Sequence, residues 1–574
     1  MDRFAEILNG LPIDLANVYI ALLRIAAPVL MGVILWQAGK PLLSFRKEPE
    51  IWALLRLESG ETLPVTHWEN IIGSHPKSDL VLELSTISRN HAVLTRYDDG
   101  SWTITDAGSK NGVRVNGRKV SIYPLEPEDV IELGGLKMVL EPITDEQEQR
   151  LARIRTRASS GLYSICSALL LTLLQAMCCL GFLLNGGAEH AADILLGFGG
   201  ICAAQWAVLA FYACIKRSAF EVETIAFFLC TMGMNVIAAT VPGEAVKQLI
   251  AMGLGLGVFF VVGWSLRDLE RAKKVRYVAT LGGIAMLVIT LLFGKEIYGA
   301  KNWLVIGGFS IQPSELSKLC FVFVGASTMD RVLQKRNLIG FIAYSVVLCG
   351  LLALMNDFGT ALIFFVAFLS IAYMRSGSVG TIGLACTSLG FAGVIALKIA
   401  PHALRRFSIW RHIWEDPLGR GYQQTRSLMC MASGGLLGLG AGNGWMRNLF
   451  ASDTDVVFAT VGEEWGLIAA MMMVAAVVIL AVFCLRSASL GRSSFYTIGA
   501  CTSASILLAQ TILNVMGTID LLPFTGVTFP FVSNGGSAMI AAWGMMAFVK
   551  AADTRQNASF AIRRVSRKIR EVEE

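Results

Sequence analysis

Apolar residues occur along this chain mainly in long runs. The first run covers residues 18–38, and twelve more lie near 160–184, 190–214, 219–241, 245–265, 277–293, 313–329, 338–355, 359–374, 379–399, 456–484, 495–517 and 535–552. A helix needs about 20 mostly apolar residues to span a bilayer, and most of these runs reach or approach that length. The pattern therefore predicts a polytopic α-helical membrane protein.

The segment 45–145 has a different pattern, in which short alternating stretches are separated by turn residues. Stretches typical of strands are 52–57, 80–84, 92–95, 102–105 and 113–115. Several short strands at this spacing predict an inserted all-β sandwich of about 100 residues. The chain then divides into a membrane anchor at 1–44, the sandwich at 45–145, a linker with two extra transmembrane helices at 146–218, a main membrane domain at 219–552 and a basic tail at 553–574.

Composition supports the membrane assignment, because 54% of the 574 residues are hydrophobic and only 16% are charged. Soluble domains carry about 25% charged residues. The run at 18–38 does not end in an Ala-x-Ala cleavage site, so we expect a retained anchor rather than a signal peptide. We expect no nucleic-acid partner.

Basic residues predict how the chain is oriented in the membrane. The alternation of the apolar runs puts the basic connectors on one side, namely 267–276, 330–336, Arg375, Arg486 with Arg492, and 563–568. Cytoplasmic connectors are enriched in Lys and Arg, so we predict that this side, with the sandwich and the C-terminus, is cytoplasmic. The opposite, outer side then receives the N-terminus, the connector at Asp357 and the segments 294–312, 400–455 and 518–534.

The outer segment 400–455 concentrates charge at the membrane surface. Glu415 and Asp416 lie among four arginines, which are Arg405, Arg406, Arg411 and Arg420. Arginine binds phosphate oxygens through its planar guanidinium group, and a nearby carboxylate can act as a general base on a hydroxyl. A solvated interfacial loop, with its arginines on lipid headgroups, explains the same residues without catalysis. Composition alone favours that simpler interpretation.

Five motifs change this balance. In chain order they are 311–319 (IQPSELSKL), 357–362 (DFGTAL), 414–427 (WEDPLGRGYQQTRS), 454–466 (TDVVFATVGEEWG) and 522–537 (LPFTGVTFPFVSNGGS). Together they resemble the signatures of the FtsW/RodA/SpoVE (SEDS) family of peptidoglycan glycosyltransferases. The resemblance covers residues 219–552 and implies a core of about ten membrane helices, to which the two runs at 160–214 are additions.

The resemblance implies an enzyme that polymerises lipid II at the outer face of the cell membrane, for cell division, elongation or sporulation. Its essential aspartate corresponds to Asp416, which would deprotonate the attacking sugar hydroxyl. Positive charge should stabilise the leaving lipid diphosphate; candidates are the four arginines and a divalent cation, Mg²⁺ or Mn²⁺, whose ligands the sequence does not identify. Further candidates for substrate binding are Gln423, Lys301, Glu315, Asp455 and Glu464. Glu315 fits equally well as a helix-start residue. The expected protein partner is a class B penicillin-binding protein, a transpeptidase.

The sandwich resembles the forkhead-associated (FHA) domain through 72–75 (IGSH), 88–91 (SRNH) and 106–117 (DAGSKNGVRVNG). This family binds phosphothreonine, and the corresponding residues are Ser88, Arg89 and Asn111. Arg89 can donate charge-assisted hydrogen bonds to a phosphate. Ser74 stands where the family usually has Arg, so docking of a protein without phosphate remains an alternative.

Two other functions compete with the glycosyltransferase. One is a lipid II flippase or transporter, and the other is a non-catalytic scaffold of the cell-wall machinery. A flippase needs polar groups through the membrane and on both faces, whereas the unusual residues here gather on the outer side. Retention of Asp416 argues against the scaffold.

Overall fold

The computed structural model describes residues 13–44, 51–76, 78–97, 100–143, 158–185, 189–297, 300–306, 309–329, 335–376, 379–399, 401–488, 493–555 and 557–561. Arg492, the basic cluster at 563–568, most of the cluster at 330–336 and most of the linker between the sandwich and the next helix lie outside these ranges. The described part contains eight helices long and apolar enough to cross a membrane, with three shorter apolar helices. A helical membrane protein with an inserted β-sandwich is confirmed.

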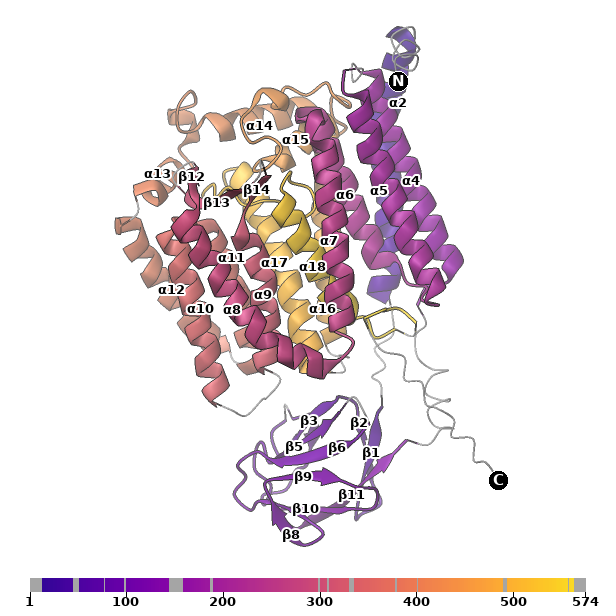
Figure 1. Cartoon of the computed structure of the whole chain (residues 1–574), viewed down its shortest axis with the longest axis vertical. Helices are drawn as coiled ribbons and strands as arrows, with labels where there is room; N and C mark the ends of the chain where they lie inside the picture. Colours follow the sequence, from indigo (N-terminus) through magenta and orange to yellow (C-terminus); the bar gives the residue numbers. More distant parts are fainter. Residues whose placement is uncertain are drawn as a thin grey trace.

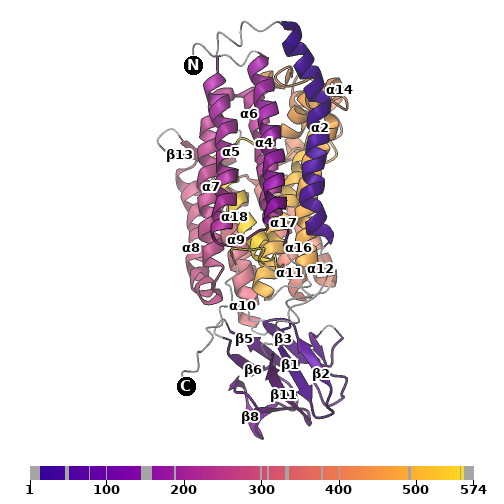
Figure 2. The same ribbon diagram turned by 90° about the vertical axis from the view of Figure 1, so that its right-hand side faces the viewer.

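Three helices stand beside the main bundle (Figure 1) and face the viewer in Figure 2: α2 (Ile13–Ser44), α4 (Gly161–Leu184) and α5 (Ala191–Cys214). Buried polar groups connect α4 and α5 to α6 (Glu221–Thr240). The amide of Gln175 donates to Gln205 Oε1 at 3.0 Å and to Thr231 Oγ1 at 3.1 Å. Burying an amide without partners is costly, so this network fixes how the additional helices pack against the bundle.

The main bundle is formed by α6 and nine further long helices. They are α7 (Ala245–Ser265), α8 (Leu269–Phe293), α9 (Pro313–Met329), α10 (Lys335–Leu354), α11 (Phe358–Ser376), α12 (Val379–Ile399), α16 (Gly466–Ala488), α17 (Ser494–Thr518) and α18 (Gly536–Ala551). α6 is buried on nearly all sides, whereas α7 and α8 expose apolar side chains such as Val261 and Leu281. A helix that is apolar all round in this way either lies inside a bundle or faces lipid.

The predicted run 456–484 is two helices rather than one. α15 (Val457–Glu464) ends before Gly466, where α16 begins. Gly466 has φ +84°, and a Cβ there would lie 2.2 Å from the carbonyl oxygen of Leu436. Only glycine adopts this conformation in so little space, so the break is set by one residue.

The inserted domain consists of two sheets packed face to face, in which the strand pairs are antiparallel except for β3 with β4. One has the order β2-β1-β11-β10-β7-β8 and the other β4-β3-β5-β6-β9. The strands are β1 (Ala53–Leu57), β2 (Thr62–Val65), β3 (Glu69–Gly73), β4 (Leu80–Val81), β5 (Ala92–Arg96), β6 (Trp102–Asp106), β7 (Val113–Val115), β8 (Arg118–Val120), β9 (Ile122–Leu125), β10 (Val130–Leu133) and β11 (Leu136–Pro142). Leu55, Ile72, Leu94 and Ile131 form part of the fully buried core between the sheets.

The sandwich and the segment 400–455 lie at opposite ends of the bundle (Figure 1). The far end carries α13 (Pro401–Ile409), α14 (Tyr422–Gly434), α15 and a small sheet of β12 (Lys295–Ile297), β13 (Ala300–Ile306) and β14 (Phe309–Ile311). The segment expected to be a long loop thus contains two α-helices, α13 and α14, joined by turns. Its residues are held against the bundle rather than extended into solvent.

Candidate functional site

Asp416 follows a single 3-10 turn, Ile413–Glu415, between α13 and α14. Its side chain is partly exposed. Oδ2 accepts a hydrogen bond from the backbone N–H of Arg420 at 3.0 Å, and Arg420 Nε lies 3.5 Å from the same oxygen. The backbone N–H of Gly421 donates to the Asp416 carbonyl at 3.0 Å. The loop therefore folds back on itself and holds the carboxylate in place at the end of the bundle opposite the sandwich.

Two glycines of this loop have no room for a side chain. A Cβ on Gly419 would lie 2.4 Å from Asp416 Oδ1, and one on Gly421 would lie 2.2 Å from the Ile413 carbonyl oxygen. Close backbone approach of this kind requires glycine. The Gly-Arg-Gly sequence after Asp416 thus determines the position of the carboxylate.

The charge of Asp416 follows from these contacts. The hydrogen bond from the Arg420 backbone amide holds the pKa of Asp416 below its ordinary value, and the Arg420 guanidinium group acts in the same direction. Asp416 is therefore ionised at neutral pH, which is the form that accepts a proton. Glu415 has a separate partner, because its Oε1 lies 2.9 Å from His412 Nδ1.

The other predicted arginines have different partners. Arg406 Nη1 donates to the Thr525 carbonyl at 2.8 Å. The Arg411 guanidinium lies 5.3 Å from the centre of the Trp410 ring, and its backbone N–H donates to Asp520 Oδ1 at 3.2 Å. Arg405 belongs to α13, but its side chain lies outside the described residues. Arg406 and Arg411 therefore connect the Asp416 segment to the outer segment 518–534.

Asp455 supplies a second carboxylate at this end of the bundle. A Cβ on Gly526 would lie 3.2 Å from its Oδ2, so the segment 518–534 passes close to it. Burial raises the pKa of Asp455 to about 6, while the Thr454 hydroxyl and the charge of Arg406 oppose this shift. The two carboxylates thus have pKa values displaced in opposite directions.

Polar side chains of α14 and α17 connect the outer segments. Gln424 Nε2 donates to the Gly517 carbonyl at 3.3 Å, and Asn514 Nδ2 donates to the carbonyls of Asp455 at 2.9 Å and Val527 at 2.8 Å. Neither residue was among the predicted site residues. An Asn inside the apolar run 495–517 was the available signal, since polar groups inside membrane segments usually have a partner or a function.

Four other predicted residues have the following contacts. Lys301 Nζ donates to the Leu292 carbonyl at the end of α8 at 3.5 Å, and Gln423 Nε2 donates to the Phe450 carbonyl at 3.0 Å. Glu315 is buried and forms a 2.7 Å ion pair with the fully buried Lys318. Glu464 is buried, and its Oε1 accepts from the Gly444 N–H at 3.4 Å. Their roles in substrate binding remain predictions.

Asp357 is a further buried carboxylate, between β13 and α11. Its Oδ1 accepts from the Thr360 N–H at 3.1 Å, which caps the start of α11. Its Oδ2 accepts from Asn302 at 3.2 Å and Gln312 at 3.5 Å. Asp357 therefore connects β13, the start of α9 and α11.

Whether this site could hold a metal ion depends on how its carboxylates are arranged. Among the described residues, no group of three or more His, Cys, Asp or Glu side chains is arranged to hold one. Mg²⁺ is commonly bound by one or two carboxylates together with substrate phosphates. Asp416 fits that mode, so a divalent cation stays a prediction that involves the substrate.

The three predicted phosphothreonine-binding residues lie on neighbouring loops of the sandwich. Ser88 Oγ accepts from the Lys110 N–H at 3.1 Å, and Asn111 Nδ2 donates to the Thr86 carbonyl at 2.7 Å. Arg89 is exposed. His91 is fully buried, and its Nδ1 accepts from the Ser88 N–H at 3.1 Å. His91 thus supports the loop, and the Arg89 side chain faces solvent.

Comparisons with known proteins identify both parts of the chain. The family model for FtsW/RodA/SpoVE cell cycle proteins matches residues 213–558, and the FHA domain model matches residues 70–134. The peptidoglycan glycosyltransferase RodA of Mycobacterium tuberculosis (strain H37Rv) is 30% identical over 325 residues, which are 53% of this chain and 69% of that protein. The probable peptidoglycan glycosyltransferase FtsW of Escherichia coli O157:H7 is 33% identical over 337 residues, which are 56% and 80%.

A solved structure shares the membrane fold. It comes from a study of polymerization and crosslinking by a peptidoglycan synthase complex, and it has 23% sequence identity and a TM-score of 0.50. The match covers 58% of this chain and 96% of that one. The chain belongs to the FtsW/RodA/SpoVE family and carries an FHA domain near its N-terminus.

Proposed function

We propose that this chain is a peptidoglycan glycosyltransferase that polymerises lipid II into glycan strands at the outer face of the cytoplasmic membrane. Its relatives of 30% and 33% identity carry that activity in their names. The observation that carries the proposal for this chain is Asp416, an ionised and partly exposed carboxylate held by its own loop.

In the proposed reaction a sugar hydroxyl attacks the anomeric carbon of a second lipid II molecule. A glycosidic C–O bond forms as the C–O bond to the lipid diphosphate breaks, and the hydroxyl proton passes to Asp416. The diphosphate leaves with the bonding electrons, so positive charge near it lowers the barrier. Arg420, beside Asp416, and Arg406, at Thr525, are the guanidinium groups best placed by their contacts. A divalent cation held by Asp416 and the diphosphate would supply further charge.

Charge and fold together support an orientation in the membrane. Arg267 lies between α7 and α8, and Lys274 and Arg276 lie in the first turns of α8, at the sandwich end of the bundle (Figure 1). Cytoplasmic connectors are enriched in such residues. Their position supports a cytoplasmic FHA domain, which would place Asp416 at the outer face, where glycan strands are assembled.

Two partners fit this arrangement. A class B penicillin-binding protein would crosslink the product, and the similar fold in a peptidoglycan synthase complex supports such a pairing. A phosphothreonine-containing protein would bind Arg89 and its neighbours on the FHA domain, which would connect synthesis to Ser/Thr phosphorylation.

The test uses the purified full chain in liposomes with lipid II, Mg²⁺ or Mn²⁺ and a candidate transpeptidase. Polymerised glycan, resolved by gel electrophoresis, is expected from the wild type and absent from Asp416→Asn. A flippase would instead move labelled lipid II between leaflets without forming polymer. A scaffold would do neither, and both outcomes contradict the proposal.

A further inference from the structure

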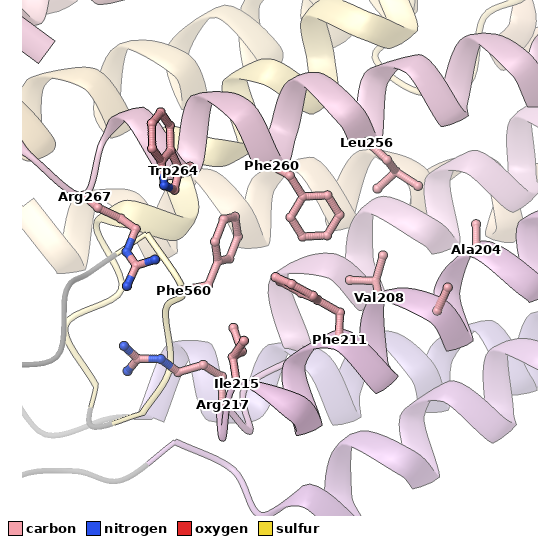
Figure 3. Close-up of a pocket in the computed structure, with 11 residues that line it drawn as sticks. Ala204, Val208, Phe211, Ile215, Arg217, Leu256, Phe260, Trp264, Arg267 and Phe560 are labelled. Carbon is pink, nitrogen blue, oxygen red and sulfur yellow. The ribbon is translucent and has the colours of Figure 1, made fainter. Parts of the chain in front are cut away.

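A cavity of about 640 Å³ lies between α5 and α7, away from the candidate active site. Figure 3 shows its walls: Ala204 and Val208 with Leu256 at one end, and aromatic side chains in the middle. α5 belongs to the additional helices, and the family model begins only at residue 213. The cavity is therefore made by a helix that the family core lacks.

Aromatic rings form the middle of the cavity. Phe211 of α5 lies 4.9 Å from Phe260 of α7, and Phe560 of the segment after α18 lies 5.4 Å from Phe260, measured between ring centres. A Cβ on Gly263 would lie 2.5 Å from the Phe560 ring, so this glycine makes room for the ring. Phe211 and Trp264 are 42% and 56% exposed. α5 and α7 are both apolar enough to span a membrane. The Phe211 ring is therefore open to an apolar ligand, while the centre of the Trp264 ring, at the end of α7, lies 4.5 Å from the Arg271 guanidinium group.

Two arginines border one end of the cavity, opposite Leu256 and Ala204. Arg217 follows α5 after a turn at Lys216, where φ is +57°, and Arg267 follows α7. Figure 3 shows both guanidinium groups beyond the aromatic rings, at the end opposite Leu256 and Ala204. That end faces the sandwich, where the candidate spans α5 and α7 end. The cavity thus has a cationic mouth and an apolar interior.

We propose that this cavity binds one anionic phospholipid of the cytoplasmic leaflet. The phosphate accepts hydrogen bonds from Arg217 and Arg267, because guanidinium groups bind phosphate oxygens with a rigid fork of donors. An acyl chain lies against Phe211 and Phe260 and continues toward Leu256 and Ala204. A basic pocket between transmembrane helices on the cytoplasmic side is a general form of lipid-headgroup site.

The phospholipid would connect the additional helices to the family core. It would contact α5 on one side, α7 on the other, and the Phe560 ring in the middle of the cavity. The two arginines and the apolar interior favour a phospholipid over a transmembrane segment of a partner protein. Such a segment would bring no phosphate to the arginines.

Native mass spectrometry of the purified full chain in detergent tests the proposal. Phosphatidylglycerol is expected to be retained at least about tenfold more strongly than phosphatidylcholine with the same acyl chains, because each basic residue near a headgroup adds about 1 kcal/mol, or about fivefold. Arg217→Gln with Arg267→Gln should remove this preference. Lys274→Gln with Arg276→Gln, which removes equal charge on α8 outside the cavity, should keep it.

Ala207→Trp gives a second test that leaves the charges in place. Its side chain would occupy part of the cavity that an acyl chain needs, so phosphatidylglycerol retention should fall. This variant decides the question if the double arginine variant fails to fold. Equal retention of the two lipids by the wild type would overturn the proposal. So would displacement of the lipid by millimolar inorganic phosphate alone, since the arginines would then bind a free anion without the acyl chains.

Discussion

Ser494 Oγ donates a 2.6 Å hydrogen bond to Glu69 Oε2, which joins the first turn of α17 to strand β3 of the FHA domain. Beside this bond the Trp68 ring packs edge-on against Tyr496, with 6.4 Å between ring centres. Tyr496 in turn donates to the Leu266 carbonyl at the end of α7 at 2.7 Å. At its other end α17 carries Asn514, which holds the Asp455 segment. One helix thus contacts both the FHA domain and the candidate site.

Replacing Trp68 and Glu69 by Ala should loosen this contact without unfolding the FHA domain. The lost aromatic pair and the lost hydrogen bond are together worth about 1–3 kcal/mol. Amide hydrogen exchange at residues 493–497 should become faster, while exchange in β7 and β10, on the other sheet, stays unchanged. Glu58→Ala, on an exposed position of the same domain, is the control. Unchanged exchange at 493–497 would contradict a stable contact.

Asp416→Asn should lower glycan synthesis by about 10²- to 10⁴-fold, the usual contribution of a general base. The matched control is Glu415→Gln, because this neighbouring, exposed carboxylate pairs with His412 instead of Arg420. Polymer formed from labelled lipid II measures both variants. Wild-type turnover by Asp416→Asn would remove Asp416 from the mechanism, and an equal loss in both variants would point to general loop charge.

Gly419→Ala tests the geometry of the loop with the carboxylate retained. The new methyl group would stand 2.4 Å from Asp416 Oδ1 and must displace it. A displacement of about 1 Å costs on the order of 10²-fold in rate, and lipid II polymerisation is the measurement. Gly253→Ala on α7, where nothing lies within 4 Å of the added carbon, should leave the rate unchanged.

Asp455 should make stability depend on pH in the direction opposite to Asp416. Its folded pKa of about 6 lies above the ordinary value near 3.8, so the folded state binds the proton more tightly. The contribution of Asp455 to the stability of the folded protein is therefore lost as pH rises from about 4 to 6. Asp455→Asn should be more stable relative to wild type at pH 7 than at pH 4, by about 2 kcal/mol. Parallel melting temperatures of both proteins across that range would contradict the assignment.

Arg89→Ala should remove any preference of the FHA domain for phosphothreonine peptides over unphosphorylated ones. A charge-assisted hydrogen bond contributes about 1.5–3 kcal/mol, so a loss of roughly tenfold or more in affinity is expected by calorimetry with the full chain. Arg114→Ala, at the exposed position of β7, is the control. If the wild type binds both peptides equally, the domain docks proteins without reading phosphate.

The spans, the sandwich and Asp416 were predictable because each depends on residues close together in the chain. Apolar runs of helical length, alternating strand positions and the Asp416–Arg420 pair, four residues apart, are local patterns. Composition alone indicated only a charged loop, and the family motifs identified Asp416 within it as a candidate general base. The break between α15 and α16 has a local cause, because Gly466 adopts a backbone conformation that other residues rarely adopt. That no other residue fits there is a tertiary effect, because the Leu436 carbonyl approaches the position too closely for a side chain.

Tertiary structure alone decided which distant residues meet. Ser494 and Glu69 are 425 positions apart, and Asn514 reaches Asp455 across 59. Glu315 and Lys318 are three positions apart on α9, so their pairing is local, and packing inside the bundle decides only that the pair is buried. Arg217 and Arg267 end different helices, and packing of α5 on α7 brings both to one cavity. Hydropathy and spacing specify each helix because backbone hydrogen bonding is local, whereas the contacts between helices depend on side-chain shape and the satisfaction of buried polar groups, which no single segment contains.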